Sequence, residues 1–332
     1  MLLSSLQHFS SKPKRMEGGN ETDVTEFILL GFSDLLQHQA LLFILFVTLY
    51  AVTLSGNIAM VTVISADSHL HRPMYFFLGN LSLVDLLFTS TTVPTMLNNL
   101  LSEKKAISFS SCLLQMYFVI LFGTAESFLL AVMAYDRYVA ICDPLHYAII
   151  MTRRFCLQLV MTSWIAASLH SLLHALLTSK LSFCRSNTIH NFFCELAKLL
   201  KLSCSDTSTN ELVIFLEGSF VVIQPFILIA VSYLRIASAI IKMPSTQGRS
   251  KVFSTCSSHL AVVALFYGTV ISLYFRPSAG GSLQQDRVAS VMYSIVAPLL
   301  NPFIYSLRNN EVKGALRRIV WRRTLQARSW MS

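Results

Sequence analysis

The stretch MAYDRYVAIC, Met133 to Cys142, closes the third long apolar segment of this chain. It places Asp136, Arg137 and Tyr138 at a membrane boundary. A carboxylate beside a guanidinium at the end of a spanning helix forms a charge-assisted contact that is stable while the helix end is covered. The contact breaks when a partner arrives, so the triplet predicts a switch at this end of the helix.

Composition places the chain in a membrane. Hydrophobic residues make up 54% of it and charged residues 13%, whereas a soluble domain has roughly 25% charged residues. Seven windows are long enough to cross a hydrocarbon core of about 30 Å. They cover about 40 to 64, 73 to 97, 112 to 136, 155 to 178, 212 to 236, 252 to 275 and 288 to 307. We predict an all-α membrane protein, a seven-transmembrane helix bundle.

The bundle is expected to be one domain. The sequence shows no repeat and no inverted pair of halves, which argues against a transporter. Pro94, Pro225, Pro298 and Pro302 interrupt spans and predict kinked helices. The predicted parts are an amino terminus over 1–39, a seven-transmembrane domain over 40–307 and a tail over 308–332.

Charge asymmetry sets the predicted orientation. An odd number of spans puts the termini on opposite sides, and lysine and arginine accumulate on the cytoplasmic side. Here they gather in the odd-numbered connections and the tail, within a net charge of +9, while most acidic residues lie on the other side. We expect a multi-pass plasma-membrane protein with an extracellular amino terminus. The basic excess predicts contact with membrane lipid and a cytosolic partner, and not with nucleic acid.

Several motifs in chain order resemble one receptor family. The DRY triplet resembles that of rhodopsin-like (class A) G-protein-coupled receptors, and with Pro144, Leu145 and Tyr147 it resembles the olfactory (odorant) receptor version. The remaining motifs are Gly56-Asn57, LHRPMYFFLGNLSLVD from Leu70 to Asp85, Ser232-Tyr233, KVFSTCSSHL from Lys251 to Leu260 and PLLNPFIYSLRN from Pro298 to Asn309. Together they cover nearly the whole chain and are most similar to the class II branch.

The amino terminus has no convincing cleavable signal, and the first span can serve as one. From Met16 onward the sequence resembles a complete olfactory receptor amino terminus, so Met1 to Arg15 is interpreted as an upstream extension. Asn20-Glu21-Thr22 is a glycosylation sequon on the predicted external side.

Cys112, Cys184, Cys194 and Cys204 lie on that same side. Four cysteines allow three pairings, and spacing does not choose among them. The resemblance implies Cys112 to Cys194 and Cys184 to Cys204, which an oxidising exterior permits.

After the seventh span, apolar residues recur at helical spacing. They are Val312, Ala315, Leu316, Ile319 and Val320. The pattern predicts an interfacial amphipathic helix, with a disordered basic tail as the alternative.

Asp85 and Glu126 are carboxylates within spans, where a lone charge is costly. The resemblance implies that the position of Asp85 binds sodium with help from Asn301. Two nearby carboxylates either share a proton or hold a cation, so an allosteric sodium ion and a neutral hydrogen-bonded pair remain the two interpretations.

Arg137 is the expected transmission residue. The resemblance implies that it leaves Asp136 and reaches the carboxy-terminal helix of a G protein as the sixth span swings out. The alternative is an arginine that snorkels to fix helix depth. The same predicted switch includes Tyr138, Tyr233, Asn301, Pro302 and Tyr305.

A ligand pocket is predicted from helical register in the outer half of the bundle. Its positions are Val119, Ile120, Gly123, Thr124, Glu217, Val221, Tyr267, Val270, Ile271, Tyr274, Val291 and Ser294. Mostly apolar walls with a few hydroxyls suit a small volatile organic molecule. For each position, ordinary helix packing is the alternative.

Glu217 has three interpretations: it contacts a ligand, reaches water, or pairs with Lys198 or Lys201. His170 and His174 have the i, i+4 spacing of a metal pair. Polar packing is favoured for them, because the sequence offers no third carboxylate or thiolate nearby.

The long loop reads HNFFCE from His190 to Glu195. In the olfactory family a His-Phe-Phe-Cys-Asp/Glu version is a proposed copper site for thiol odorants. Here the histidine stands one place too early, which argues against metal-assisted sensing by this loop.

The resemblance implies an odorant receptor that binds a small, mostly hydrophobic volatile molecule, activates a heterotrimeric G protein of the stimulatory olfactory type and raises cyclic AMP. No enzyme activity is expected, and no cofactor other than the sodium ion. The alternative is a same-fold receptor for a metabolite or hormone-like ligand outside the olfactory epithelium. A carrier or channel would need a continuous polar path, whereas Asp85 and Glu126 provide only a mid-membrane pocket.

Overall fold

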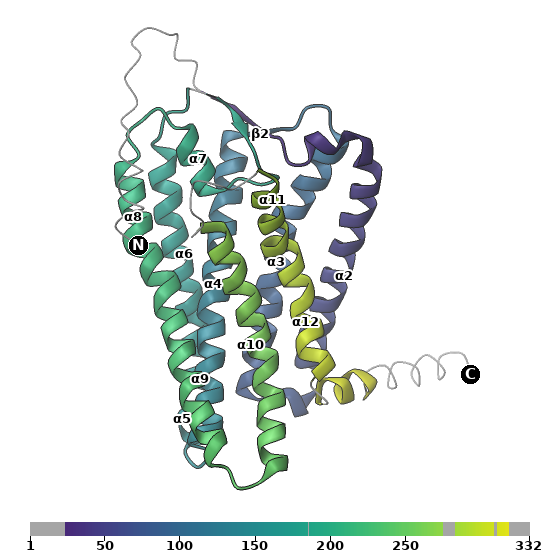
Figure 1. Cartoon of the computed structure of the whole chain (residues 1–332), viewed down its shortest axis with the longest axis vertical. Coiled ribbons are helices and arrows are strands. Elements are labelled where there is room, and N and C mark those ends of the chain that lie inside the picture. The colour runs from purple at the N-terminus through teal and green to yellow at the C-terminus, as the bar shows by residue number, and fades with distance from the viewer. Residues whose placement is uncertain (1–23, 185, 275–282, 309–310, 319–332) are drawn as a thin grey trace, which may run out of the picture.

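The chain folds into a bundle of long helices that run side by side (Figure 1). This computed structural model describes residues 24–184, 186–274, 283–308 and 311–318. Within these ranges, 7 helical stretches are long and apolar enough to cross a membrane. The predicted seven-span bundle is therefore confirmed.

The spanning stretches keep the predicted order but begin or end a few residues away from the predicted limits. They are α2 (Gln39–Ala66), α3 (Pro73–Leu101), α4 (Phe109–Cys142), α6 (Arg153–Ser179), α8 with η3 and α9 (Ser208–Gly218, Ser219–Ile223, Gln224–Lys242), α10 (Thr246–Tyr274), and α11 with η4 and α12 (Leu283–Val291, Met292–Val296, Ala297–Arg308). Shorter helices in the connections are η1 (Ser33–His38), η2 (Ser68–Leu70), α5 (Tyr147–Ile150) and α7 (Leu196–Leu202).

Local sequence explains where several spans begin. Helix α3 begins with Pro73, whose fixed backbone angle and missing N–H suit the first turn. Helices α4 and α6 begin after Ser108 and Thr152, whose side chains accept hydrogen bonds from the backbone N–H three residues on. Such caps satisfy donors that the helix leaves unpaired at its start.

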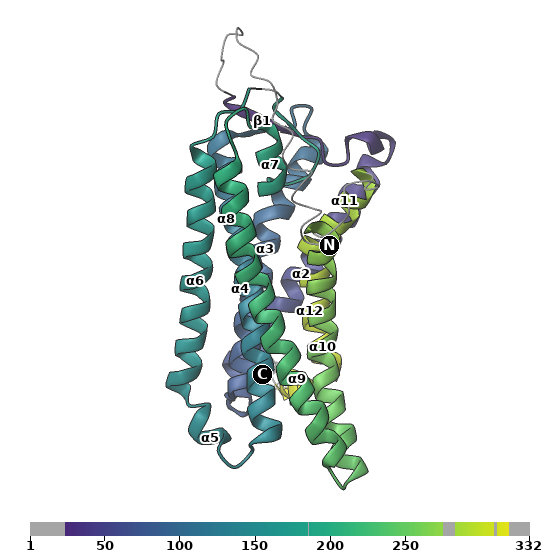
Figure 2. The ribbon, with the colours of Figure 1, turned by 60° about the vertical axis from the view of Figure 1, so that its left-hand side comes forward.

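Helix α4 is the central element of the bundle. It packs against α3, α6 and α9, and Figure 2 shows α3 and α4 between α6 on one side and α10 with α12 on the other. Its apolar window is mostly buried, whereas those of α2 and α6 are mostly exposed. A residue on α4 can therefore face several other spans at once.

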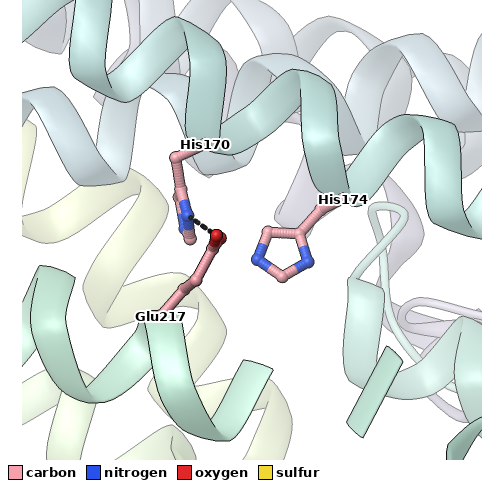
Figure 3. A group of neighbouring side chains, drawn as sticks. All are labelled: His170, His174 and Glu217. Carbon is pink, nitrogen blue, oxygen red and sulfur yellow. Dashed lines mark hydrogen bonds and ion pairs between the residues drawn. The ribbon is translucent and has the colours of Figure 1, made fainter. Parts of the chain in front are cut away.

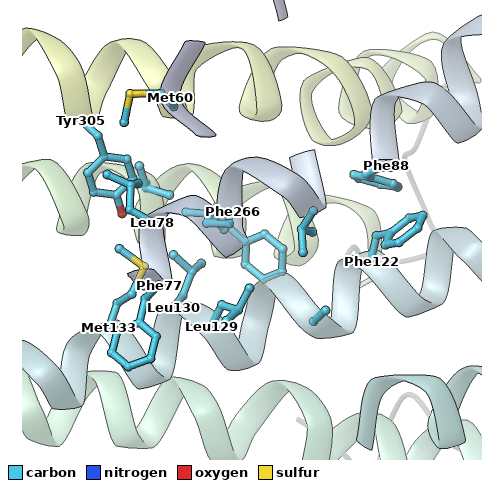
Figure 4. Close-up of a cluster of buried hydrophobic side chains, with 14 of the residues drawn as sticks. Met60, Phe77, Leu78, Phe88, Phe122, Leu129, Leu130, Met133, Phe266 and Tyr305 are labelled. Atoms are coloured by element: carbon cyan, nitrogen blue, oxygen red, sulfur yellow. The ribbon is translucent and has the colours of Figure 1, made fainter. Parts of the chain in front are cut away.

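The interior is filled by large apolar side chains from several spans (Figure 4). Phe77 and Phe88 of α3 and Leu129 and Leu130 of α4 are completely buried. Phe266 of α10 joins the same cluster. In a bilayer, this close packing, rather than exclusion from water, favours helix association.

Two π-helical turns interrupt the regular helices. They are η3 in the fifth span and η4 in the seventh. A π turn adds about one residue to a helical turn, which rotates the preceding residues by about 100° relative to an unbroken α-helix. Both turns lie among the residues from which the ligand pocket was predicted.

One end of the bundle, which we call the cap end, is covered by a small sheet. Strand β1 (Glu26–Leu29) pairs antiparallel with β2 (Ala106–Ser108) and parallel with β3 (Thr188–Ile189). The two predicted disulfides, Cys112 to Cys194 and Cys184 to Cys204, are both formed here. They attach the long loop to the cap end of α4 and close it on itself.

At the opposite end, the tail end, residues 311–318 form the predicted interfacial helix. Figure 1 shows this helix turning away from the bundle axis after α12. Its Val312 and Ala315 are completely buried, as the apolar spacing predicted. Ile319 and Val320 lie outside the described residues, as does the predicted glycosylation site Asn20.

Candidate functional site

The tail end of α4 carries the Asp136-Arg137-Tyr138 triplet. Asp136 is buried and accepts a hydrogen bond from the Tyr147 hydroxyl at 2.8 Å. The expected ion pair between Asp136 and Arg137 is not formed among the described residues, because the turn into α5 brings Tyr147 to the carboxylate instead. Burial, and then the Asp136 carboxylate, raise the pKa of Tyr147, which keeps it a hydrogen-bond donor at neutral pH.

Arg137 lies near polar groups of three other spans as well as near Asp136. Its Nη2 atom is buried and has no hydrogen-bond partner among the described residues. The charge of Arg137 acts on Tyr233, His259 and Tyr305. The hydroxyl of Tyr305 is likewise buried without a hydrogen bond. Arg137 therefore faces the interior between α4, α9, α10 and α12.

A hydrogen-bond chain closes this region. The Nε2 atom of His259 on α10 lies 3.1 Å from the carbonyl oxygen of Leu130 on α4, and its Nδ1 atom lies 2.8 Å from the hydroxyl of Tyr233 on α9. A carbonyl only accepts, so Nε2 carries the proton and Nδ1 accepts from Tyr233. Sequence analysis placed His259 in a motif but missed this role, since the spacing along α10 does not reveal the facing carbonyl.

The predicted carboxylate pair lies at the middle of the bundle. Asp85 is fully buried and accepts two hydrogen bonds from the Asn301 amide, at 3.2 Å and 3.0 Å. Both oxygens of Glu126 are buried and have no hydrogen-bond partner among the described residues. The structure thus brings the three predicted residues together, with the Glu126 oxygens available to a cation or a shared proton.

Most of the predicted pocket positions face the interior. Those buried are Val119, Gly123, Thr124, Val221, Tyr267, Val270 and Ser294. Ile120 and Val291 are half-buried. Ile271 is 53% exposed, so its predicted interior placement is not found; it lies at the edge of the buried face of α10. The side chain of Tyr274 lies outside the described residues.

A hydrogen-bonded group crosses this interior. The Ser127 hydroxyl lies 3.0 Å from the Tyr267 hydroxyl and donates to the carbonyl oxygen of Val221 at 3.3 Å. Three spans, α4, α10 and the η3 turn of the fifth, therefore meet at one polar point. Ser127 was not predicted, although it follows Glu126 directly on the central helix.

Tyr293 is a second interior residue that sequence analysis missed. It lies in η4, and its ring packs against Phe88 and Phe266 at centroid distances of 5.0 Å and 6.0 Å. Its hydroxyl lies against Gly123, so closely that a Cβ atom at Gly123 would overlap it. Unbroken helical register predicts Val291 and Ser294 for the interior and neither of the two residues between them.

Glu217 points to α6 instead of a loop cation (Figure 3). Its Oε2 atom lies 3.2 Å from Nδ1 of His170. The position of Glu217 relative to Pro225 was predicted for an unbroken helix, and the intervening η3 turn changes that register. His170, His174 and Glu217 have ligand-type atoms that all lie within 4.8 Å of one another.

The long loop lies at the cap end of the bundle, where it contacts α11. Asn191 donates to Glu195 at 3.0 Å and to the Ser290 hydroxyl of α11 at 3.3 Å. Lys198 pairs with Asp286 of α11 at 2.6 Å. Burial raises the pKa of Glu195. His190 is exposed, while Glu195 is buried.

Seven apolar spans among the described residues, a disulfide-pinned cap and an Asp-Arg-Tyr triplet at the tail end of α4 together define a seven-helix membrane protein. The family model "Olfactory receptor" matches residues 46–323. Olfactory receptor 1G1 of Gorilla gorilla gorilla is 55% identical over 312 residues, which cover 94% of this chain and 100% of that protein. Olfactory receptor 1f45 of Rattus norvegicus is 54% identical over 92% of this chain and 97% of its own. Olfactory receptor 1F1 of Homo sapiens is 53% identical over 92% of this chain and 98% of its own.

The chain therefore belongs to the olfactory receptor family. Its members are G-protein-coupled receptors and not enzymes. An odorant as ligand and a G protein as partner follow in general terms, and the resemblance predicted from the motifs is confirmed.

Proposed function

We propose that this receptor binds a small, mostly hydrophobic volatile molecule between α4, the fifth span, α10 and the seventh span, and that binding activates a stimulatory, olfactory-type G protein and raises cyclic AMP. The observation that carries the ligand class is the polar point formed by Ser127, Tyr267 and the Val221 carbonyl within otherwise apolar walls. Such a setting favours ligands that are apolar apart from one hydrogen-bonding group.

The position of this polar point explains how a ligand can act on the whole bundle. Tyr267 and His259 lie on the same helix, two turns apart, and His259 bonds to Leu130 of α4. A ligand that competes for the Ser127 or Tyr267 hydroxyl changes the packing of α10 against α4. Binding then shifts the equilibrium only by the difference in its affinity for the two arrangements of α10.

The G protein contact belongs to the tail end in this proposal. Arg137 is held there with an unpaired Nη2 atom behind the Tyr233-His259-Leu130 chain. Outward movement of α10 breaks the His259 contact and exposes Arg137, the charged group suited to a G protein's carboxy-terminal helix. Tyr138, Pro302 and Tyr305 complete this switch in the same proposal.

The orientation follows from the charge pattern. We place the cap end outside the plasma membrane and residues 308–332 in the cytosol, with 1–39 as the extracellular segment and 40–307 as the receptor domain. Disulfides at the cap end suit an oxidising compartment. Basic residues at the tail end suit anionic lipid.

A cyclic AMP assay against an odorant panel tests the proposal. Cells that express the receptor should respond to at least one volatile, and Arg137→Ala at equal surface expression should give no rise at any dose. Arg154→Ala is the matched control, because Arg154 is exposed at the same end, and its response should stay close to that of the unchanged receptor. A normal odorant response from surface-expressed Arg137→Ala would contradict the proposed transmission.

A further inference from the structure

A second candidate site lies between α6 and α8 and includes Glu217, one of the predicted pocket positions. His170 and His174 stand one turn apart on α6, and Glu217 faces them from α8 (Figure 3). The two imidazole rings have centroids 4.6 Å apart and are nearly perpendicular. Two elements far apart in sequence thus present two ring nitrogens and a carboxylate to one point.

The distances suit a transition metal. Two histidines and a glutamate are a recurrent zinc set, with bonds of about 2.0–2.2 Å, so neighbouring ligand atoms in a tetrahedral shell lie about 3.3 Å apart. The Glu217 oxygen and the His170 nitrogen are already 3.2 Å apart. The remaining separations between the three ligand-type atoms are all within 4.8 Å.

His174 is the most buried of the three side chains. It is 3% exposed, and its Nδ1 atom has no hydrogen-bond partner among the described residues. Figure 3 shows its other ring nitrogen, Nε2, on the side of the ring that faces Glu217. The nearly fully buried His174 therefore presents a ring nitrogen to the His170–Glu217 pair.

We propose that His170, His174 and Glu217 bind a divalent transition-metal ion of the zinc type, for which Cu²⁺ is the tighter competitor. Three protein ligands leave a fourth position for water or an added ligand. That position faces the side where the Glu217 side chain is 40% exposed. The ion joins α6 to α8 directly before the η3 turn, so it restrains the cap half of the fifth span and modulates signalling.

The first test uses the purified full-length receptor in detergent, carrying an epitope tag without histidine. Zinc titration after chelation should raise the thermal unfolding midpoint, since an ion that binds only the folded state stabilises it by mass action. His174→Ala and Glu217→Gln should each weaken zinc binding at least about 10-fold, because loss of even an outer-shell partner costs about 10- to 100-fold. His190→Ala, in the exposed loop, is the matched control and should bind zinc unchanged.

A ligand-preserving variant separates metal binding from packing. Glu217→His keeps three ligands and should retain zinc binding that Glu217→Gln loses, whereas a purely structural role predicts no such rescue. If His174→Ala or Glu217→Gln fails to fold, X-ray absorption of the zinc-loaded unchanged receptor tests the site instead. A bound zinc with two imidazole ligands supports the site. Zinc without imidazole ligands, or equal zinc affinity in folded Glu217→Gln and the unchanged receptor, would overturn it.

Discussion

At the scale of single residues, the pair Gly123 and Tyr293 determines how the interior is filled. The absence of a side chain at Gly123 lets the Tyr293 hydroxyl lie directly against α4. Tyr293 in turn separates Phe88 from Phe266. A single glycine therefore sets where an aromatic side chain from the seventh span sits in the predicted ligand region.

We expect Gly123→Ala to destabilise the receptor by about 1–3 kcal/mol, the usual cost of overfilling a packed interior. The added Cβ would overlap the Tyr293 hydroxyl but lie 3.3 Å from its ring carbon Cζ. Adding Tyr293→Phe should therefore recover part of the loss. Thermal unfolding of the purified single and double variants measures this coupling.

The matched control is Gly268→Ala, since nothing lies within 4 Å of a Cβ at that glycine. Alanine there is expected to be neutral or mildly stabilising, because alanine favours helix over glycine by about 1 kcal/mol. Equal unfolding midpoints for Gly123→Ala and Gly268→Ala would show that Tyr293 does not pack as described.

At the scale of elements, the helix over 311–318 is held by charges at both of its ends. Its first residue, Glu311, accepts hydrogen bonds from Arg72 at 3.2 Å and from Tyr75 at 2.8 Å. Its last, Arg318, donates two bonds to one oxygen of Asp67, at 2.9 Å and 2.6 Å. All three partners belong to the connection between α2 and α3 or to the first turn of α3, so the helix is attached to the first two spans.

We expect Asp67→Asn to loosen this helix at neutral pH, seen as faster hydrogen–deuterium exchange over 311–318. The bonds from Arg318, and then those from His69, lower the pKa of Asp67 from 3.8 to about 2. A carboxylate with a lowered folded-state pKa stabilises the fold above its ordinary pKa and loses that contribution as the pH falls toward the folded value. The unchanged receptor should therefore keep slow exchange until the pH drops below about 4.

Asp143→Asn provides the control for this experiment. Asp143 pairs with His146 at 2.8 Å, in the connection between α4 and α6. Its removal should leave the exchange of residues 311–318 unchanged. Equal exchange in Asp67→Asn and the unchanged receptor at pH 7 would mean that Val312 and Ala315 alone hold the helix.

The same element shows what periodicity can predict. Val312 and Ala315 are buried as their spacing indicated, because an unbroken helix keeps its register from one turn to the next. Register failed where π turns intervene: Glu217 faces α6, and Tyr293 is turned inward. Nothing in the local apolar pattern marks these turns, so the sequence did not reveal that Glu217 lies beside His170.

At the scale of the whole molecule, the seven-helix bundle could be predicted from the sequence. The hydrogen bonds between its elements could not. Seven long apolar runs are each sufficient to indicate a span. The partners of Asp136 and His259 depend on how helices and turns come together in space. The family resemblance predicted that Asp85 and Asn301 lie together, and the hydrogen bonds between them agree with that prediction.

We expect the carboxylate pair, Asp85 and Glu126, to couple the two ends of the molecule, and a sodium titration can test this coupling. Asp85 and Glu126 lie between the ligand region and Arg137, and the Glu126 oxygens have no partner among the described residues. Oxygen atoms are the ligands that hard cations prefer. A sodium ion bound to one state of the bundle favours that state by its differential affinity, and coupling between sites is usually worth about 1–3 kcal/mol, or about 5- to 150-fold.

If sodium occupies this place in the resting receptor, replacing potassium by sodium at constant ionic strength should lower basal cyclic AMP and move the odorant dose response to higher concentrations. Joint replacement by Asp85→Asn and Glu126→Gln should abolish that dependence, because no carboxylate remains to hold the cation. Glu211→Gln, near the cap end, should leave it intact, since Glu211 bonds to Thr207 and not to the central pair. Sodium sensitivity that survives the joint replacement would place the ion elsewhere. Absence of any sodium effect in the unchanged receptor would favour a shared proton between the two carboxyl groups.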